Sequence, residues 1–310
     1  MTRKFDAVVI GAGPAGLTAA RIIAAARLSC LIIDKMGPGG QLMNMGEVHD
    51  VPGLDPGTTG PDLLARLLDE TMAAGAELAV DEVTGIDGGT PWHIRAAEAP
   101  VTATALVVAT GLGHGNTGTG EDLYYEGRGI SHCAICDGPL YAGKRVVVTG
   151  DDDWAAQEAI DLAAMVSHVT LVSGGTLTAL MLQRRAKLET LANLRILQGR
   201  VTALTGIDRL EAVVVATSGA TERIAASGLF AFSDRRPATE FLKGRLHATL
   251  AGHIEVGADQ HASAAGIFAC GDVANPAERI AMAIADGEKA GQNAVRWVTS
   301  ESPDLERRPP

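Results

Sequence analysis

Two cysteines separated by two residues, Cys133 and Cys136, form the most reactive pattern in the sequence. This spacing brings two sulfur atoms within bonding reach across one turn, and a helix that begins there lowers a thiol pKa toward neutral pH. The pattern therefore predicts dithiol–disulfide exchange. His132 directly precedes the pair and is a candidate for tuning it, the alternative being a surface histidine without a role.

Zinc coordination is the competing interpretation of the cysteine pair. A structural zinc ion needs four ligands, and the sequence has no second Cys-x-x-Cys and no histidine pair at ligand spacing. Cys30 and Cys270 lie in apolar, strand-like segments and are expected to be small buried residues. We therefore predict no metal site.

A glycine-rich turn, Gly11 to Gly16, indicates a second kind of chemistry. It follows an apolar segment, 7–10, that is typical of a buried parallel strand, and helix-forming residues follow at 17–26. A further apolar strand, 30–33, ends at Asp34. These elements make up one βαβ unit.

Each polar or glycine position of this unit suits a dinucleotide. Gly11 permits the tight turn, Gly13 lets the backbone approach a pyrophosphate, and Gly16 allows close helix–strand packing. A carboxylate at Asp34 can accept hydrogen bonds from ribose hydroxyls. The strand, the turn, the helix and the acid together predict a dinucleotide-binding module.

The same arrangement occurs a second time. An apolar segment, 146–149, leads into Gly150, a helical segment follows at 155–165, and another strand is predicted at 169–172. Gly150 precedes Ser173 by the same number of positions as Gly11 precedes Asp34. Two dinucleotide-binding modules therefore lie in one chain.

A third segment, Gly266 to Val273, reads as a strand ending in Gly-Asp, followed by a helix from about Ala277 to Trp297. If it completes the first sheet, the first domain is discontinuous. We therefore predict an α/β fold of two Rossmann-like domains with three-layer ββα/βαβ architecture, the second inserted into the first. The predicted boundaries are 1–114 with 243–310 for the first domain and 115–242 for the second.

Composition limits the partners. The 310 residues carry a net charge of −11 without clustered Lys or Arg, which argues against nucleic acid and anionic membranes as ligands. No apolar run reaches the roughly 18 residues that a membrane span needs, and the N-terminus lacks a signal-peptide pattern. We expect a cytoplasmic protein that acts on small molecules or proteins.

A set of ordered motifs resembles one known family. The motifs are Gly11–Gly16, Gly39-Gly40-Gln41-Leu42, Pro52-Gly53, Thr59-Gly60-Pro61, Ala109-Thr110-Gly111, Gly127-Arg128-Gly129, Cys133–Gly138 and Gly266–Val273. In order and spacing they are similar to the low-molecular-weight thioredoxin reductases, from about residue 5 to residue 298. The resemblance implies a homodimer with FAD in the discontinuous domain, and an inserted domain that carries the cysteine pair and ordinarily binds NADPH.

The resemblance also implies roles for single residues. Cys136 would exchange electrons with the flavin, Cys133 would be exposed to attack a partner disulfide, and Asp137 would donate and accept the proton. For FAD, the implied contacts are Gly11, Gly13, Ala15 and Gly16 at the pyrophosphate, Asp34 at the adenosine ribose, Gln41 and Leu42 at the isoalloxazine, Thr110 and Gly111 on the diphosphate side, Asp272 at the ribitol, and the amides of Ile280 and Ala281 at the flavin O2 edge. Further candidates are Pro14, Lys35, Gly40, Asp50, Val83, Gly271 and Arg279.

Two of these positions depart from the family pattern. Asp50 stands where Asn is usual before the Pro-Gly turn, and an ionised carboxylate cannot donate a hydrogen bond. Ile280 stands where Gln commonly follows the arginine matched by Arg279. The flavin-edge contacts are thus expected to differ from those of the family.

The second module departs further. Asp152 aligns with Gly13 and Ala155 with Gly16, and Asp151 to Asp153 would cap the following helix. A carboxylate about 4 Å from a phosphate repels it by roughly 4 kcal/mol at an effective dielectric constant near 20. Ser173-Gly174-Gly175 also replaces the family's His-Arg-Arg clamp for the 2′-phosphate, although Arg184, Arg185 and Lys187 lie downstream.

We therefore predict that NADPH is not the physiological electron donor. The favoured function is an FAD-dependent disulfide oxidoreductase that takes electrons from a ferredoxin-like or other redox protein and passes them to a thioredoxin-like protein or small disulfide. The alternatives are a flavin-dependent dithiol oxidase that uses oxygen, an ordinary NADPH-thioredoxin reductase with a divergent nucleotide site, and a non-catalytic flavoprotein.

Overall fold

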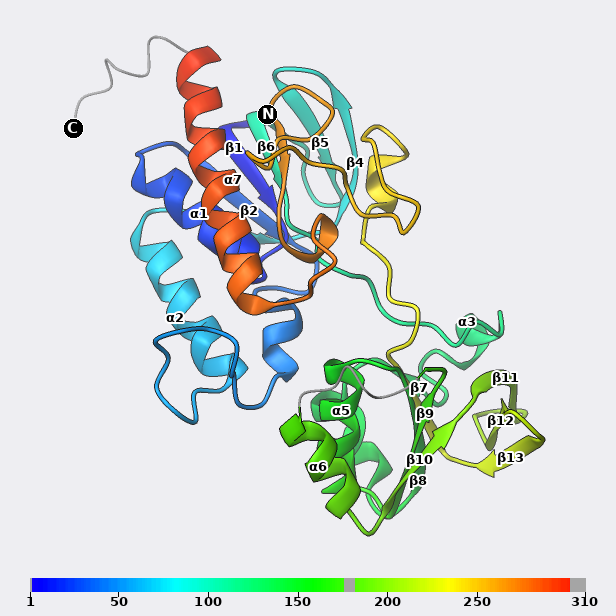
Figure 1. Ribbon diagram of the computed structural model, residues 1–310. Coiled ribbons are helices and arrows are strands. Elements are labelled where there is room, and N and C mark those ends of the chain that lie inside the picture. Colours follow the sequence, from blue (N-terminus) through cyan, green and yellow to red (C-terminus); the bar gives the residue numbers. More distant parts are fainter. Residues whose placement is uncertain (1, 176–181, 302–310) are drawn as a thin grey trace. The chain divides into compact units, whose positions relative to one another are not determined.

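A computed structural model of the chain describes residues 2–175 and 182–301. The chain divides into two compact units, unit 1 (residues 1–113 and 236–310) and unit 2 (residues 114–235), shown in Figure 1. Each unit is built on a largely parallel sheet with helices on one face. The predicted fold class, two Rossmann-like domains with the second inserted into the first, is confirmed.

Unit 1 contains the ends of the chain and the first glycine-rich turn. Its elements are β1 (Arg3–Ile10), α1 (Pro14–Ala25), β2 (Cys30–Asp34), η1 (Gly40–Asn44), α2 (Gly60–Ala73), β3 (Glu77–Val80), β4 (Val83–Gly88), β5 (Trp92–Ala96), β6 (Val101–Val108), η4 (Glu240–Leu242), β15 (Ile267–Ala269), η5 (Gly271–Val273) and α7 (Ile280–Glu301).

The sheet of unit 1 has the strand order β3-β2-β1-β6-β5-β4, and β15 also pairs with β6. Strands β2, β1, β6 and β15 are parallel, whereas β4, β5 and the start of β6 form an antiparallel meander. Strand β6 serves both parts because residues 101–103 pair with β5 and residues 106–108 pair with β15.

Alternation along these strands builds two cores. Val9, Ile32 and Val107 face helices α1, α2 and α7. Val8, Leu31 and Leu106 face the meander and the segment after η4 on the other side. A sheet buried on both faces needs the nearly continuous apolar strands that the sequence shows, and it fixes the glycine turn at the carboxyl end of β1.

Unit 2 holds the cysteine pair. Its elements are α3 (Asp122–Tyr125), β7 (Ile130–Ser131), α4 (Ala134–Asp137), η2 (Gly138–Tyr141), β8 (Arg145–Thr149), α5 (Asp153–Ala163), β9 (His168–Ser173), α6 (Leu182–Thr190), β10 (Leu194–Gln198), β11 (Arg200–Thr205), β12 (Ala212–Ala216), β13 (Thr221–Ala225) and β14 (Gly228–Ala231).

The sheet of unit 2 is parallel, in the order β10-β9-β8-β14-β7, and β11, β12 and β13 form a separate antiparallel sheet. One face of the parallel sheet packs on α5 and α6, and the other packs on the three-stranded sheet. The predicted repeat is visible in the backbone, because the amides of Gly11 and Gly150 each donate to the carbonyl at the end of the neighbouring strand, Ile33 and Val172.

Helix α7 begins later than predicted, at Ile280 rather than near Ala277, and extends to Glu301. The side chain of Asn275 accepts a hydrogen bond from the amide of Ala277, and Glu278 has a φ of 49°, so residues before Arg279 form a turn. A left-handed residue cannot continue an α-helix.

The units change over at Gly113/His114 and Arg235/Arg236, whereas the predicted boundaries were 114/115 and 242/243. The observed second boundary lies seven residues before the predicted one, because Leu242 is buried in the core of unit 1 and Phe241 packs against that core. The glycine at position 244 that suggested a linker lies instead beyond this anchored turn. Among the described residues, no helix is both long and apolar enough to cross a membrane.

Candidate active site

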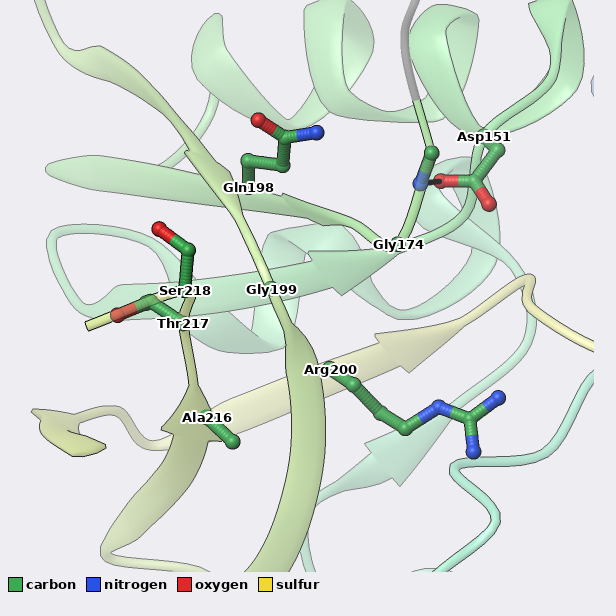
Figure 2. Close-up of a pocket in the computed structure, with 9 residues that line it drawn as sticks. Asp151, Gly174, Gln198, Gly199, Arg200, Ala216, Thr217 and Ser218 are labelled. Atoms are coloured by element: carbon green, nitrogen blue, oxygen red, sulfur yellow. Dashed lines mark hydrogen bonds between the residues drawn. The ribbon is translucent and has the colours of Figure 1, made fainter. Parts of the chain in front are cut away.

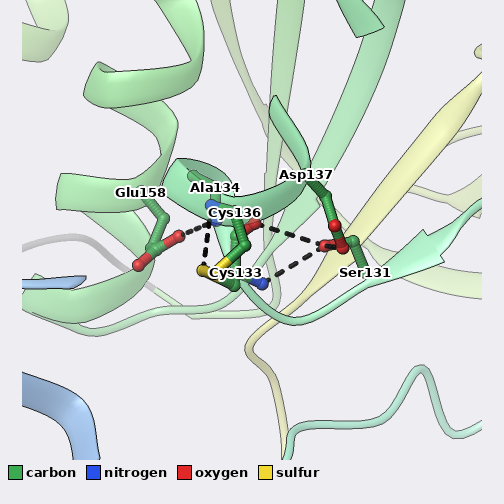
Figure 3. The surroundings of a disulfide bond; sticks show 6 residues. All are labelled: Ser131, Cys133, Ala134, Cys136, Asp137 and Glu158. Carbon is green, nitrogen blue, oxygen red and sulfur yellow. Dashed lines mark hydrogen bonds between the residues drawn. A yellow bond between two sulfur atoms is a disulfide. The ribbon is translucent and has the colours of Figure 1, made fainter. Parts of the chain in front are cut away.

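The cysteine pair lies directly after β7, at the start of α4. Cys133 and Cys136 are joined by a disulfide with a Cα–Cα distance of 5.4 Å (Figure 3). Cys133 is the residue before the helix, and its sulfur accepts a hydrogen bond from the amide of Cys136 at 3.1 Å. One helical turn therefore fixes both sulfur atoms.

Ser131, at the end of β7, connects the disulfide to Asp137. Its hydroxyl donates to Oδ2 of Asp137 at 2.7 Å and accepts from the amide of Cys133 at 3.2 Å. Ser131 is buried and Asp137 is half-buried. A hydroxyl that donates and accepts at once holds the carboxyl group beside the disulfide in one orientation.

Glu158 approaches the pair from helix α5. Its Oε2 accepts a hydrogen bond from the amide of Ala134 at 2.6 Å, and its side chain is buried in the core beneath α4. Burial raises the pKa of Glu158 to about 8, a shift that the Ala134 amide opposes. A second carboxyl group therefore lies next to the cysteine turn.

The two cysteines of the disulfide differ in exposure, and the resemblance implied that Cys133 would be exposed to a partner. In this structure Cys136 is exposed and Cys133 is half-buried. Cys30 and Cys270 are free thiols and buried, as predicted, and burial raises the pKa of Cys30 to about 12. Over residues 2–175 and 182–301, no cluster of three or more His, Cys, Asp or Glu side chains is arranged to hold a metal ion.

The ring of His132 is mostly buried and contacts two other side chains. Its Nε2 lies 2.8 Å from Oε1 of Glu126, and its ring stacks on that of His114 at a centroid distance of 4.6 Å. Its side chain is 18% exposed. Of the two interpretations, the structure therefore favours a residue with partners over an unengaged surface histidine.

The glycine turn of unit 1 is open above α1. Gly13 precedes the helix without a side-chain cap, and a Cβ atom built on it would meet nothing within 4 Å. In contrast, a Cβ on Gly16 would lie 1.9 Å from the carbonyl oxygen of Gly11. The turn thus combines close packing below with free amides and free space above, which fits a pyrophosphate.

Further predicted residues surround this turn. Asp34 accepts hydrogen bonds from the amides of Ala12, at 2.8 Å, and Met36, at 2.9 Å, which orient its carboxylate beside the turn. A Cβ on Gly40 would be 3.5 Å from the Cα of Gly13, and one on Gly271 would be 2.8 Å from the Cβ of Ala15. Segments from three parts of the chain therefore meet at one edge of the sheet.

The start of α7 differs from the expectation. The amide of Ile280, predicted to face a flavin, donates instead to Oδ2 of Asp50 at 2.9 Å. A carboxylate at this helix start is favourable, since it compensates the partial positive charge there. The departure from the family pattern at Asp50 therefore has a structural partner within the chain.

The other predicted cofactor residues lie as follows. Pro14 is the first residue of α1, Leu42 is buried and Gln41 half-buried in η1, Thr110 donates to the carbonyl of Ala238, the carbonyl of Gly111 accepts from the amide of Ala238, and the carbonyl of Asp272 contacts His253. Arg279 is exposed and Ala281 half-buried, Val83 begins β4, and Lys35 is exposed with its Nζ 3.6 Å from Glu82.

The turn of the second module is filled by its own side chains. Asp152 caps α5, because its Oδ1 accepts from the amide of Ala155 at 2.8 Å. Its Oδ2 lies 2.5 Å from the guanidinium of Arg235, whose side chain is 8% exposed. Asp153 pairs with Arg184 at 3.4 Å. The predicted capping is confirmed for Asp152, and a carboxylate stands at the position that Gly13 holds in unit 1.

Asp151, the residue before Asp152, binds the end of β9 and the segment that follows it. Its Oδ1 accepts from the hydroxyl of Ser173 at 2.6 Å and from the amide of Gly175 at 3.2 Å. It lines a cavity of about 570 Å³ between the ends of β9, β10 and β12, shown in Figure 2. Among the described residues that line this cavity, Arg200 is the one cation.

Three residues of the site were missed by sequence reasoning: Ser131, Glu158 and Arg235. The sequence did carry a signal for Glu158. It occupies the same helix face as Ala155, Ala159 and Leu162, all buried, so a charged residue interrupts an apolar stripe. Arg235 gave no comparable signal, because it lies 83 positions from Asp152.

Comparison with known proteins agrees with this geometry. Residues 5–287 match the model of the pyridine nucleotide-disulphide oxidoreductase family. Thioredoxin reductase of Listeria monocytogenes is 32% identical over 313 aligned positions that cover 97% of this chain and 96% of the relative.

Solved structures give the same result. Lactococcus lactis thioredoxin reductase in its FR conformation superposes with a TM-score of 0.86 at 29% identity, covering 96% of this chain and 99% of that one. A ferredoxin-flavin thioredoxin reductase from Clostridium acetobutylicum reaches a TM-score of 0.55 at 25% identity, covering 97% and 100%. The chain belongs to the pyridine nucleotide-disulphide oxidoreductase family, as a thioredoxin reductase-like FAD disulfide oxidoreductase.

Proposed function

We propose that this protein passes electrons between FAD in unit 1 and a partner disulfide through Cys133 and Cys136, and that NADPH is not its electron donor. The partner class is a thioredoxin-like protein or a small disulfide, since thioredoxin reductases are its relatives. The donor class is a redox protein, as the name of the ferredoxin-flavin enzyme from Clostridium acetobutylicum suggests.

The cofactor site of this proposal is the open edge of the unit 1 sheet. Gly11, Gly13 and the start of α1 would hold the pyrophosphate, and Asp34 would accept from the adenosine ribose. The remaining candidates named above would line the rest of the cofactor. When bound, FAD would supply a two-electron carrier for the disulfide.

The residues of unit 2 supply thiol exchange. In the reduced pair, one thiolate attacks a sulfur of the partner disulfide, forming a mixed disulfide and expelling the other partner sulfur as a thiolate. The second cysteine then attacks its neighbour in the pair, which restores the Cys133–Cys136 bond and releases the partner as a dithiol. Asp137, held by Ser131, can accept the proton that the attacking thiol loses and supply the proton that the departing thiolate takes up.

The capped turn at Asp152 supports the proposal that NADPH is not the electron donor. In unit 1 the corresponding position is Gly13, with an uncapped helix and free space above it. In unit 2 the carboxylate of Asp152 accepts a hydrogen bond from the amide of Ala155 in the first turn of α5 and pairs with Arg235. A bound pyrophosphate would therefore have to displace this ion pair and would be repelled by the carboxylate. Asp151 fills the adjoining position in the same way.

Anaerobic reduction of the purified flavoprotein tests this proposal. Flavin absorbance is followed by stopped flow after mixing with NADPH, with NADH, or with a dithiol, in wild-type protein and in Cys136→Ser. We expect reduction by the dithiol in the wild type alone and none by either nucleotide within the time of turnover. Rapid bleaching by micromolar NADPH would contradict the donor assignment, and failure of the dithiol to reduce the wild type would contradict the cysteine–flavin couple.

We also propose a cytoplasmic homodimer, as for the family that the sequence resembles. Two buried free thiols, Cys30 and Cys270, suit a reducing compartment. Light scattering of the purified protein measures its molar mass, which should be twice the 32.0 kDa of one chain for a dimer.

A further inference from the structure

A buried carboxyl group lies beneath the disulfide and has no part in the exchange chemistry described above. The side chain of Glu158 is 1% exposed and belongs to a helix face otherwise made of Ala155, Ala159 and Leu162. Glutamate is rarely buried so completely unless its carboxyl group has a partner. Its presence in an alanine-rich stripe therefore calls for a function or a specific contact.

The contact is with the cysteine turn. Oε2 of Glu158 accepts from the amide of Ala134 at 2.6 Å, and Ala134 follows Cys133 directly (Figure 3). Over the described residues, Oε1 of Glu158 is buried without a hydrogen-bond partner. The carboxyl group is thus anchored to the redox pair by one oxygen and poorly stabilised as an anion at the other.

We propose that Glu158 is a positioning residue for the redox pair: it holds the Ala134 amide in place and, by its charge state, sets the reduction potential of the Cys133–Cys136 couple. The inference rests on the proposed function only in requiring that this pair is redox-active, and it does not depend on which donor supplies electrons.

The surroundings of Glu158 define what else can influence it. Helix α4, which begins in the cysteine turn and ends at Asp137, lies on one side of Glu158. The charged groups that act on Glu158 are Asp161, on its own helix, and Arg235, in the segment after β14. Strands β8 and β9 present apolar side chains to the same core, and Arg184 on α6 pairs with Asp153. The pKa of Glu158 is raised to about 8, mainly by burial; the Ala134 amide and Arg235 oppose this shift, and Asp161 adds to it.

The direction of the effect follows from charge. Reduction breaks the S–S bond, adds two electrons, and at alkaline pH leaves negative charge on the sulfur atoms. Below pH 8, Glu158 is mostly neutral and does not oppose that charge. Above pH 8, an ionised Glu158 would oppose it, so reduction is disfavoured or draws one additional proton onto Glu158.

Redox equilibration of the full-length flavoprotein tests the proposal. Wild type, Glu158→Gln and Glu189→Gln are equilibrated anaerobically with glutathione buffers from pH 6 to 9.5. After acid quenching and alkylation, mass spectrometry of the peptide containing Cys133 and Cys136 gives the oxidised fraction. Gln keeps the acceptor for the Ala134 amide but cannot ionise, and Glu189 is an exposed residue of the same unit.

We expect the three proteins to share one potential up to about pH 7. At pH 9 we expect the exchange equilibrium of Glu158→Gln to favour the reduced pair about tenfold more than in the wild type, which corresponds to about 30 mV. Glu189→Gln should follow the wild type throughout. Parallel curves for wild type and Glu158→Gln across the whole range would overturn the role of Glu158. A wild-type pair that stays oxidised in every buffer would instead overturn the proposed function.

Discussion

The hydroxyl group of Ser131 connects β7 both to the disulfide turn and to its neighbouring acid. It donates to Asp137 and accepts from the amide of Cys133. Because Ser131 is 3% exposed, water cannot replace these bonds easily. Ser131 thus helps to determine where the carboxyl group of Asp137 lies.

Ser131→Ala should therefore impair exchange more than folding. We expect kcat/KM for disulfide reduction to fall about tenfold, since one positioned hydrogen bond to a charged group is worth roughly 1.5 kcal/mol. Ser167→Ala, which removes an exposed serine of the same unit, is the matched control. Equal kcat/KM for Ser131→Ala and the wild type would show that Asp137 keeps its place without this bond.

At this scale the sequence predicted the bonded cysteine pair, which the structure shows as a disulfide, and missed the residues that contact its turn. Cys133, Cys136 and Asp137 are adjacent in the chain, so their pattern is visible without a structure. Glu158 reaches Ala134 across 24 positions and Arg235 reaches Asp152 across 83, and such pairings arise only when helices and strands pack.

The two glycine turns show how one element type can be open in one unit and closed in the other. In unit 1, Gly16 packs against Gly11, and a Cβ atom built on Gly13 would meet nothing within 4 Å. In unit 2, Ala155 replaces the close-packed glycine, and a Cβ on Gly150 would lie 2.3 Å from that of Ala155. The strand–turn–helix is kept, while the carboxylate of Asp152 takes the place of Gly13 and is bound to the amide of Ala155 and to Arg235.

Two alanine substitutions separate packing from binding in unit 1. Gly16→Ala places a Cβ 1.9 Å from the Gly11 oxygen, so we expect it to unfold the turn and give little soluble protein. Gly13→Ala meets nothing within 4 Å and should fold with a thermal midpoint near that of the wild type, but retain FAD at least tenfold more weakly. Flavin content and dissociation constants of the purified proteins measure both effects. Unchanged FAD affinity in Gly13→Ala would place the pyrophosphate elsewhere.

At the scale of elements, the strands predicted at 30–33, 146–149 and 169–172 end within one residue of β2, β8 and β9 because they are almost wholly apolar, whereas β1 begins at Arg3, four residues before the predicted 7–10. The start of α7 was predicted three residues early, since a left-handed Glu278 leaves no signature in a sequence of good helix formers. The amide of Ile280 was likewise assigned to a ligand, whereas Asp50, 230 positions away, accepts from it.

At the scale of the molecule, a raised pKa makes stability depend on pH. The pKa of Glu158 is about 8 when folded and 4.5 is its ordinary value, so between these values the unfolded chain is ionised and the folded chain is not. Stability from this group is fully present below about pH 4.5 and is lost as pH rises toward 8.

Chemical denaturation from pH 5 to 9 checks this sign. We expect Glu158→Gln to gain stability relative to the wild type as pH rises, by up to about 1 kcal/mol per pH unit, with a plateau above pH 8. The tryptophan in unit 2, Trp154, reports on that unit when Trp92 and Trp297 of unit 1 are replaced by Phe in both proteins. A stability difference that is constant with pH would show that Glu158 ionises normally.

The number of domains and their insertion were predictable because the glycine turn recurs and the last strand pairs within unit 1. The second boundary was not, because the predicted boundary assigned Leu242 to the inserted domain, whereas Leu242 is buried in the core of unit 1. Composition reports where a chain is polar, but not which apolar residue of a short turn is covered.

The two chain crossings have a practical consequence. Leu112 pairs with Pro237, and the amide of Gly113 donates to the carbonyl of Arg236 at 2.7 Å, within unit 1. Within unit 2, the amide of Asn116 donates to the carbonyl of Ser233 at 2.8 Å. Each unit therefore has its two cut ends side by side. One gene could join residue 113 to residue 236 through a short glycine linker, and a second gene could encode residues 114–235 alone. The two units could then be produced as separate proteins, because neither core contains residues of the other unit.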